Sequence, residues 1–196
     1  MEKSRFEKQM DFLLEIDKAK MIFRQTYLSD GKRKENDAEH SWHTAIMAFV
    51  LAEYFDSSID VMKVMKMMLM HDLVEIYAGD TYCYDEAGIS TQEERELAAA
   101  NRLYSLLPED QMEEYKSLWL EFEAKETAES KFCEILDRLQ PSMLNFANEG
   151  ASWKEHDIHK HQVLKRNEPI FKGPETIAEY YKSKIEDAME KGFLKE

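Results

Sequence analysis

The chain has 196 residues, 43% of them hydrophobic, so it suits one domain, or one domain with a small appendage, that buries a core without disulfides. Its net charge of −14 argues against a general binder of DNA or RNA, because both polymers repel an acidic protein, but it does not exclude a small anionic substrate. The two cysteines make no disulfide framework, no apolar run reaches the roughly 18 residues of a membrane-spanning helix, and the N-terminus is too charged for a signal peptide, so we expect a cytoplasmic protein without membrane contact.

Residues that favour helices dominate the chain, which has only four prolines and six glycines. Apolar residues recur at helical spacing, and no segment shows the period of two that marks a half-buried strand. The predicted helices span about residues 5–27, 37–54, 59 to beyond 71, 91–107, 108–123, 125–148, 159–166 and 175–191. We therefore predict an all-α fold, a single-domain helical bundle over residues 1–196, with its core at about 20–150 and a C-terminal helical extension at 151–196.

Short polar side chains mark the starts of two predicted helices, because they can accept hydrogen bonds from free backbone N–H groups. Asn36 or Asp37 can cap the second helix, and Ser90 or Thr91 begins a sequence that resembles a capping box. Pro141 lies inside the longest predicted helix of the second half, where its missing N–H should kink or split that helix.

The dipeptide His71-Asp72 ends an apolar helical stretch in the segment MMLMHDLVEIYAGD. Burying two such side chains without partners is costly, and a divalent cation is one partner that would satisfy both. A buried ion pair with a purely structural role is the alternative interpretation.

Two further side chains can complete a metal site around this dipeptide. His40 lies on the preceding helix, which a short connection makes an antiparallel neighbour, and Asp137 lies in the apolar segment CEILDRLQ of a later helix. Together the four residues offer two nitrogen and two oxygen ligands and leave positions for water and substrate. Manganese, cobalt, iron, zinc and nickel all accept such ligands, so the identity of the ion stays open.

The segments AEHSWH, MHDLVEIYAGD and ILDRLQ resemble the ordered H…HD…D motif of the HD-domain superfamily of metal-dependent phosphohydrolases. More narrowly, they resemble the bacterial 5′-deoxynucleotidase-like branch of that superfamily, over about residues 24–137. The resemblance implies an HD-type helical fold, usually as a homodimer, a divalent metal held by His40, His71, Asp72 and Asp137, and hydrolysis of a phosphate ester.

The resemblance also implies roles for residues around the metal ligands. Glu75 and Asp80 match the family's catalytic acidic residues in the spacing HDxxExxxxD, and Glu75 could orient water or donate a proton to the leaving group. Arg24 and Arg33 match cationic residues that face the phosphate. His43, three residues after His40, is expected to contact substrate or pack beside the site, with a ligand role as the alternative.

We therefore predict hydrolysis of a nucleoside or deoxynucleoside 5′-monophosphate, with one divalent ion, because two-metal relatives recruit further histidines and this chain has none at residues 73–155. The expected partner is a small phosphorylated substrate and not a nucleic acid polymer. Rival functions on the same site are hydrolysis of a nucleotide pyrophosphate, phosphodiester or triphosphate, a non-catalytic nucleotide-binding module, and a metal-dependent oxygenase. A triphosphate would need more cationic groups, which Lys131 or Arg138 could add.

Overall fold

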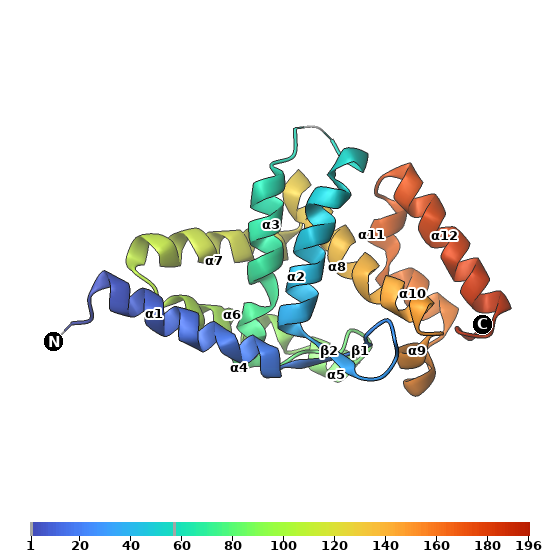
Figure 1. The fold of residues 1–196 in the computed structure, drawn as a ribbon, viewed down its shortest axis with the longest axis horizontal. Coiled ribbons are helices and arrows are strands. Elements are labelled where there is room, and N and C mark those ends of the chain that lie inside the picture. The colour runs from blue at the N-terminus through green and yellow to red at the C-terminus, as the bar shows by residue number, and fades with distance from the viewer. Residues whose placement is uncertain (1, 57) are drawn as a thin grey trace.

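The computed structural model describes residues 2–56 and 58–196, and these residues are mainly helical (Figure 1), which confirms the all-α class. The α-helices are α1 (Arg5–Ile16), α2 (Asp37–Val50), α3 (Val61–Met70), α4 (Glu75–Ala78), α5 (Glu86–Ile89), α6 (Gln92–Tyr104), α7 (Glu109–Ala124), α8 (Ala128–Ala147), α9 (Ala151–Glu155), α10 (Lys160–Arg166), α11 (Glu168–Phe171) and α12 (Glu175–Glu190). Three 3₁₀ helices and two strands join them: η1 (Asp17–Met21), η2 (Ala52–Tyr54), η3 (His71–Val74), β1 (Phe23–Tyr27) and β2 (Lys34–Asn36).

A short β-hairpin follows α1, so the predicted helix over 5–27 and the prediction of no strands are wrong here. The helix ends at Ile16, and β1 pairs antiparallel with β2, with Phe23 opposite Asn36. The segment FRQTY contains residues that favour strands, and Gly31 adopts a φ of 68° that lets the chain turn back. The hairpin places β1 beside α8 and α9 and leads directly into α2.

Helix caps explain where α2 and α8 begin, but not where α6 begins. Asn36 caps α2 in a reciprocal capping box with Glu39, which confirms the predicted start. Thr91 precedes α6 without a side-chain cap bond, so the capping box predicted there is wrong. Thr127 caps α8, which continues unbroken through Pro141, so the proline does not split this helix.

Helices α2, α3 and α8 pack against one another at the centre of the molecule, with α1, α6 and α7 to one side and α9 to α12 to the other (Figure 1). One buried cluster joins the central helices to the C-terminal ones, through residues such as Met68, Leu136 and Tyr181. A second cluster joins α1, η3, α6 and α7, through residues such as Phe12 and Leu103. The segment η3 therefore lies where the two clusters meet.

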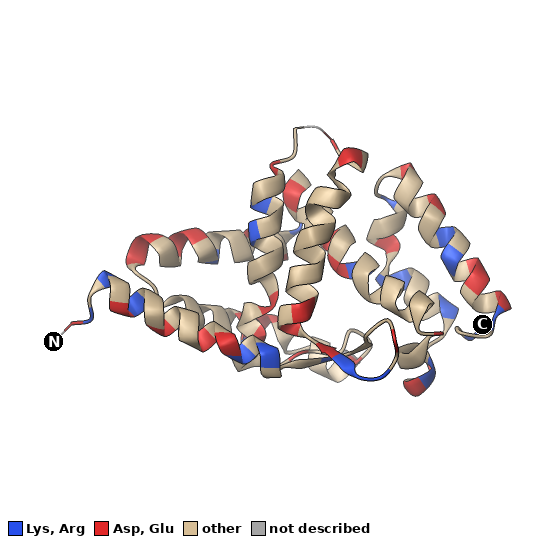
Figure 2. Cartoon of the chain, viewed as in Figure 1, with Lys and Arg blue, Asp and Glu red and all other residues tan. Residues whose placement is uncertain are grey.

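Charged residues are spread over the outer helices, with acidic residues along α1, α7 and α12 among basic ones (Figure 2). None of the helices in residues 2–56 and 58–196 combines the length and the apolar character that crossing a bilayer requires.

Candidate metal centre and pocket

Three central elements bring the four predicted metal ligands together. His40 lies in the first turn of α2, His71 and Asp72 lie in η3, and Asp137 lies in the middle of α8. The helix α3 ends at Met70 and tightens into η3, so the dipeptide lies on a 3₁₀ turn rather than inside a longer α-helix. Both imidazole rings are buried, and their centroids are 5.4 Å apart.

The Nε2 atoms of both histidines face the same two carboxylates. His40 Nε2 lies 3.1 Å from Asp137 Oδ1 and 3.8 Å from Asp72 Oδ2. His71 Nε2 lies 3.1 Å from Asp72 Oδ1 and 3.6 Å from Asp137 Oδ1. The four side chains therefore converge on one point, as the sequence motif predicts.

The opposite ring nitrogens fix the orientation of both imidazoles. His40 Nδ1 lies 3.0 Å from Gln140 Oε1, and His71 Nδ1 lies 2.9 Å from the carbonyl oxygen of Met68. An Nδ1–H that donates to these oxygens leaves the Nε2 lone pair directed at the carboxylates, which is the arrangement of metal-binding histidines. His71 Nε2 is buried and has no hydrogen-bond partner among the described residues, so the donor set fits a divalent cation.

Without a cation, the charges in this cluster shift one another's pKa values. Burial alone would lower the pKa of His71, but the carboxylates of Asp72 and Asp137 raise it to about 10. The neighbouring histidines in turn hold the pKa of Asp137 well below its usual range despite its burial. The metal-free site therefore keeps protons on its imidazoles that a cation would have to displace.

A second group of acidic side chains lies beside the first. Asp37, Glu75 and Asp80 bring carboxylate oxygens together, and both oxygens of Asp37 are buried without hydrogen-bond partners among the described residues. Burial raises the pKa of Asp37 to about 7 and that of Glu75 well above its usual value, with Asp72 as the next cause for both. These oxygens could hold a proton or a cation.

Arg24 reaches from β1 into the space between the two groups. Its Nη1 lies 2.6 Å from Asp72 Oδ2, and carboxylate oxygens of Glu35, Asp37 and Asp137 lie 3.8–4.0 Å from its guanidinium nitrogens. Arg24 therefore neutralises protein carboxylates in this structure, whereas the sequence predicts that it faces phosphate.

The structure does not bring Arg33 or His43 into the pocket. Arg33 is exposed and forms a bidentate ion pair with Glu39, at 2.6 and 2.8 Å. His43 is half-buried, and its Nδ1 lies 3.2 Å from Gln140 Nε2. Neither residue lines the cavity that contains His71 and Asp72.

Sequence reasoning missed three buried residues that support the site. Gln140 bridges His40 and Glu35, because its Nε2 donates to Glu35 Oε1 at 2.6 Å while its Oε1 contacts the ring. Gln140 follows Asp137 by three residues, so helical spacing could have indicated it. The sequence offers Asp37 only as an alternative to Asn36 for the helix cap, so it does not indicate a place in the site. Nothing in the residues around Glu35 indicates that it is buried beside His40.

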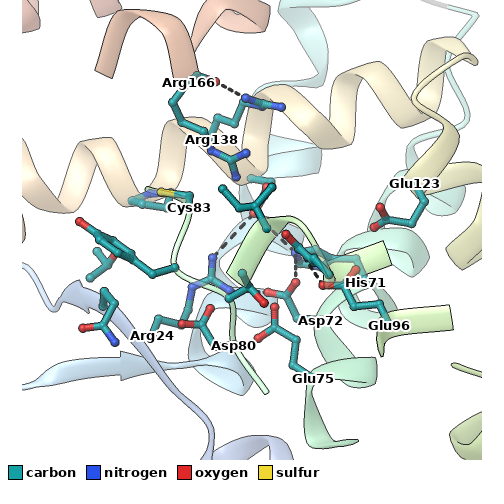
Figure 3. A pocket seen from close by; sticks show the side chains of 18 of the residues that line it. Arg24, His71, Asp72, Glu75, Asp80, Cys83, Glu96, Glu123, Arg138 and Arg166 are labelled. Atoms are coloured by element: carbon teal, nitrogen blue, oxygen red, sulfur yellow. Dashed lines mark hydrogen bonds and ion pairs between the residues drawn. The ribbon is translucent and has the colours of Figure 1, made fainter. Parts of the chain in front are cut away.

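A pocket of about 690 Å³ opens over the two groups (Figure 3), within the roughly 300–1,000 Å³ that is typical of small-molecule sites. Arg24, Glu75 and Asp80 lie on its lower side in this view, and Arg138 and Arg166 lie above. Apolar and further acidic side chains complete the wall: Tyr82, Tyr84, Trp119, Phe122, Trp153, Glu96 and Glu123.

A family model described as HD domain matches residues 16–178, so the chain belongs to the HD domain family. Among curated relatives, the human protein named 5′-deoxynucleotidase HDDC2 is 29% identical over 132 residues, which cover 67% of this chain and 63% of that protein. The protein of Photobacterium profundum named 5′-deoxynucleotidase PBPRA2627 is 33% identical over 92 residues, 43% of this chain and 47% of its own length. The chain thus spans less than two thirds of the length of these relatives.

Solved structures show the same architecture. A protein from Magnetospirillum magnetotacticum, described as a predicted metal-dependent phosphohydrolase, is 49% identical with a TM-score of 0.94, and the match covers 98% of this chain and 97% of that one. A conserved hypothetical protein from Pyrococcus furiosus is 26% identical with a TM-score of 0.61, over 92% of this chain and 99% of that one.

Proposed function

We propose that this protein is a metal-dependent phosphohydrolase that cleaves the phosphate monoester of a nucleoside or deoxynucleoside 5′-monophosphate. The proposal rests mainly on one observation: two imidazole Nε2 atoms converge on the carboxylates of Asp72 and Asp137, which line a pocket large enough for a nucleotide. The names of the human and bacterial relatives, and the description of the Magnetospirillum protein, support this class of reaction.

In this proposal His40, His71, Asp72 and Asp137 hold one divalent ion of the first transition series or zinc. The mixed nitrogen and oxygen donors and the unpartnered Nε2 of His71 support that choice. A bound ion of this kind supplies a water of lowered pKa and withdraws charge from the phosphate. The carboxylates of Asp37, Glu75 and Asp80 form the rival position for a second ion, and elemental analysis of active protein distinguishes one ion per chain from two.

Glu75 is the proposed proton donor to the leaving oxygen. Its pKa is raised well above the usual value, first by burial and then by the negative charge of Asp72, which favours the protonated acid. Asp80 lies in the same acidic group and would orient water or a sugar hydroxyl. Arg24 would keep Asp72 and its neighbouring carboxylates in place through its short ion pair.

The decisive assay is phosphate release by metal-free protein after Mn²⁺, Co²⁺, Zn²⁺, Fe²⁺, Ni²⁺ or Mg²⁺ is added back in turn. The substrates are nucleoside and deoxynucleoside mono-, di- and triphosphates. We expect release from monophosphates, restored by one or two of the transition metals. Activity confined to triphosphates would favour the rival hydrolase, and stoichiometric metal binding without any turnover would favour a nucleotide-binding module.

We further propose a cytoplasmic homodimer. Cys83 and Cys133 are both free thiols, which suits a reducing compartment. On α1, four apolar side chains with exposures of 48–76% recur at the spacing of one helix face: Phe6, Met10, Leu13 and Leu14. Such a face on a surface helix supports an interface between two copies of the chain.

A further inference from the structure

Two arginines from separate helices meet at the side of the pocket opposite Glu75 (Figure 3). Arg138 directly follows Asp137 on α8, and Arg166 is the last residue of α10. Arg138 Nη1 donates to the carbonyl oxygen of Arg166, so the two residues are in direct contact. Both line the same cavity as His71 and Asp72.

The two positive charges of this pair are balanced by only one carboxylate among the described residues. Arg138 has one carboxylate, Glu134, at 2.5 Å, and its buried Nε has no partner among the described residues. The guanidinium of Arg166 makes no hydrogen bond or ion pair with any described side chain, since only its backbone carbonyl is engaged. Two adjacent guanidinium groups with one carboxylate favour the approach of a further anion.

The arginines that the sequence indicates for phosphate are already paired. Arg24 is surrounded by carboxylates, with Asp72 at 2.6 Å, and Arg33 is paired with Glu39 outside the pocket. A phosphate monoester carries roughly two negative charges at neutral pH, and the acidic side of the pocket would repel it. Beside the proposed metal ion, a further cationic group for this phosphate would then come from another wall of the pocket.

We propose that Arg138 and Arg166 form an anion subsite that binds the phosphate group of the substrate next to Asp137. The inference rests on the proposed function for the identity of that anion. Guanidinium groups suit this role because each presents parallel N–H donors that match two phosphate oxygens. The subsite would hold the non-reacting oxygens and would orient the phosphate toward the four proposed metal ligands.

Arg166→Gln tests the subsite with little risk to folding, because the guanidinium makes no hydrogen bond or ion pair with a described side chain. Lys165→Gln is the matched control, since it removes the same charge from an exposed neighbour on the same helix. We would measure KM and kcat for deoxynucleoside mono-, di- and triphosphates, and the Kd of inorganic phosphate by calorimetry on metal-loaded protein. Circular dichroism checks that each variant is folded, and elemental analysis checks that each variant carries the same amount of metal.

We expect Arg166→Gln to raise both KM and the phosphate Kd about tenfold, the effect of losing one charge-assisted hydrogen bond, with metal content unchanged. Arg166→Lys should recover part of the loss, and Lys165→Gln should match the wild type. Wild-type values of KM and Kd in Arg166→Gln would overturn the subsite while the hydrolase proposal stands. A loss confined to di- and triphosphates would also overturn it, because the pair would then bind a second phosphate group.

The two proposals can fail separately. Arg166-dependent binding of inorganic phosphate by a protein that hydrolyses no nucleotide would support the subsite and contradict the proposed reaction.

Discussion

The buried side chains at the centre of the pocket carry more negative charge than their protein partners neutralise. Four carboxylates surround the single guanidinium of Arg24, and two imidazoles direct their Nε2 atoms at two of these, Asp72 and Asp137. A divalent cation would take the place of the protons that the two imidazoles hold in the metal-free protein. A substitution in this cluster should therefore act through the charge that it removes, and not only through the change in side-chain shape.

Metal affinity should depend on pH through His71. Because Asp72 and Asp137 raise the pKa of His71 to about 10, its ring is protonated in metal-free protein near neutral pH, and a cation must displace that proton. Apparent affinity for Mn²⁺ or Co²⁺ should then rise about tenfold per pH unit for each proton displaced, between about pH 7 and about pH 9. Calorimetry in buffers of different ionisation enthalpy counts the protons, and an affinity that is flat over this range would contradict the site.

Asp72→Ala should abolish turnover and leave the helices intact. The substitution removes a proposed ligand and the short ion pair of Arg24, so activity should fall by about a thousandfold or more. Asp187→Ala, which removes a partly exposed carboxylate from α12, is the matched control. A well-folded Asp72→Ala protein with full activity would rule out the proposed centre.

Glu75→Gln should lower kcat about 10²- to 10⁴-fold, because glutamine cannot supply the proton that the leaving oxygen needs. The wild-type activity should decline as pH rises through the elevated pKa of Glu75, since only the protonated acid donates. The variant should lose that alkaline limb and keep its metal. A variant with an unchanged pH profile would show that Glu75 is not the donor.

At the scale of elements, periodicity predicts most of the helices, because apolar residues recur at helical spacing along the face that each helix buries. The hairpin of β1 and β2 escaped this reasoning, since a five-residue strand is too short to show alternation and the apolar spacing around Ile22 continues that of α1. The motif likewise indicates the four proposed metal ligands, whose side chains the structure brings together. Arg166 and Asp37 could not be assigned to the site in advance, because their place depends on contacts between distant segments. The sequence indicates Arg138 only as a further cation for a triphosphate.

Two glycines with positive φ angles allow the energetic cost of backbone strain to be measured apart from the cost of a steric overlap. Gly150 and Gly192 have φ angles of 72° and 68°, and a Cβ at Gly192 would meet nothing within 4 Å. A Cβ at Gly150 would overlap the carbonyl oxygen of Phe193. Gly192→Ala should cost about 1–2 kcal/mol of unfolding free energy through its φ angle alone, and Gly150→Ala clearly more. Urea denaturation measures both, and equal losses would show that the close approach at Gly150 has no energetic consequence.

At the scale of the whole molecule, the C-terminal helices share a core with the central ones. Tyr181 and Ile185 on α12 belong to the same buried cluster as Met68 and Leu136. The HD family model extends to residue 178, beyond the core of about 20–150 that the sequence suggests. We propose that residues 1–196 form one domain in which the C-terminal extension is part of the core.

Leu14→Glu should weaken the proposed dimer. Leu14 is 76% exposed on the apolar face of α1, and a buried carboxylate in an interface would be strongly unfavourable. Light scattering coupled to size exclusion should show a dimer for the wild type and a shift toward monomer for the variant. A wild-type monomer at micromolar concentration would contradict the dimer.

The most direct test of the metal centre is an anomalous difference map from crystals of active protein loaded with Mn²⁺ or Co²⁺. We expect a strong peak within bonding distance of Nε2 of His40 and His71 and of the carboxylates of Asp72 and Asp137. Metal-dependent, active protein whose anomalous peaks all lie away from these four side chains would contradict it.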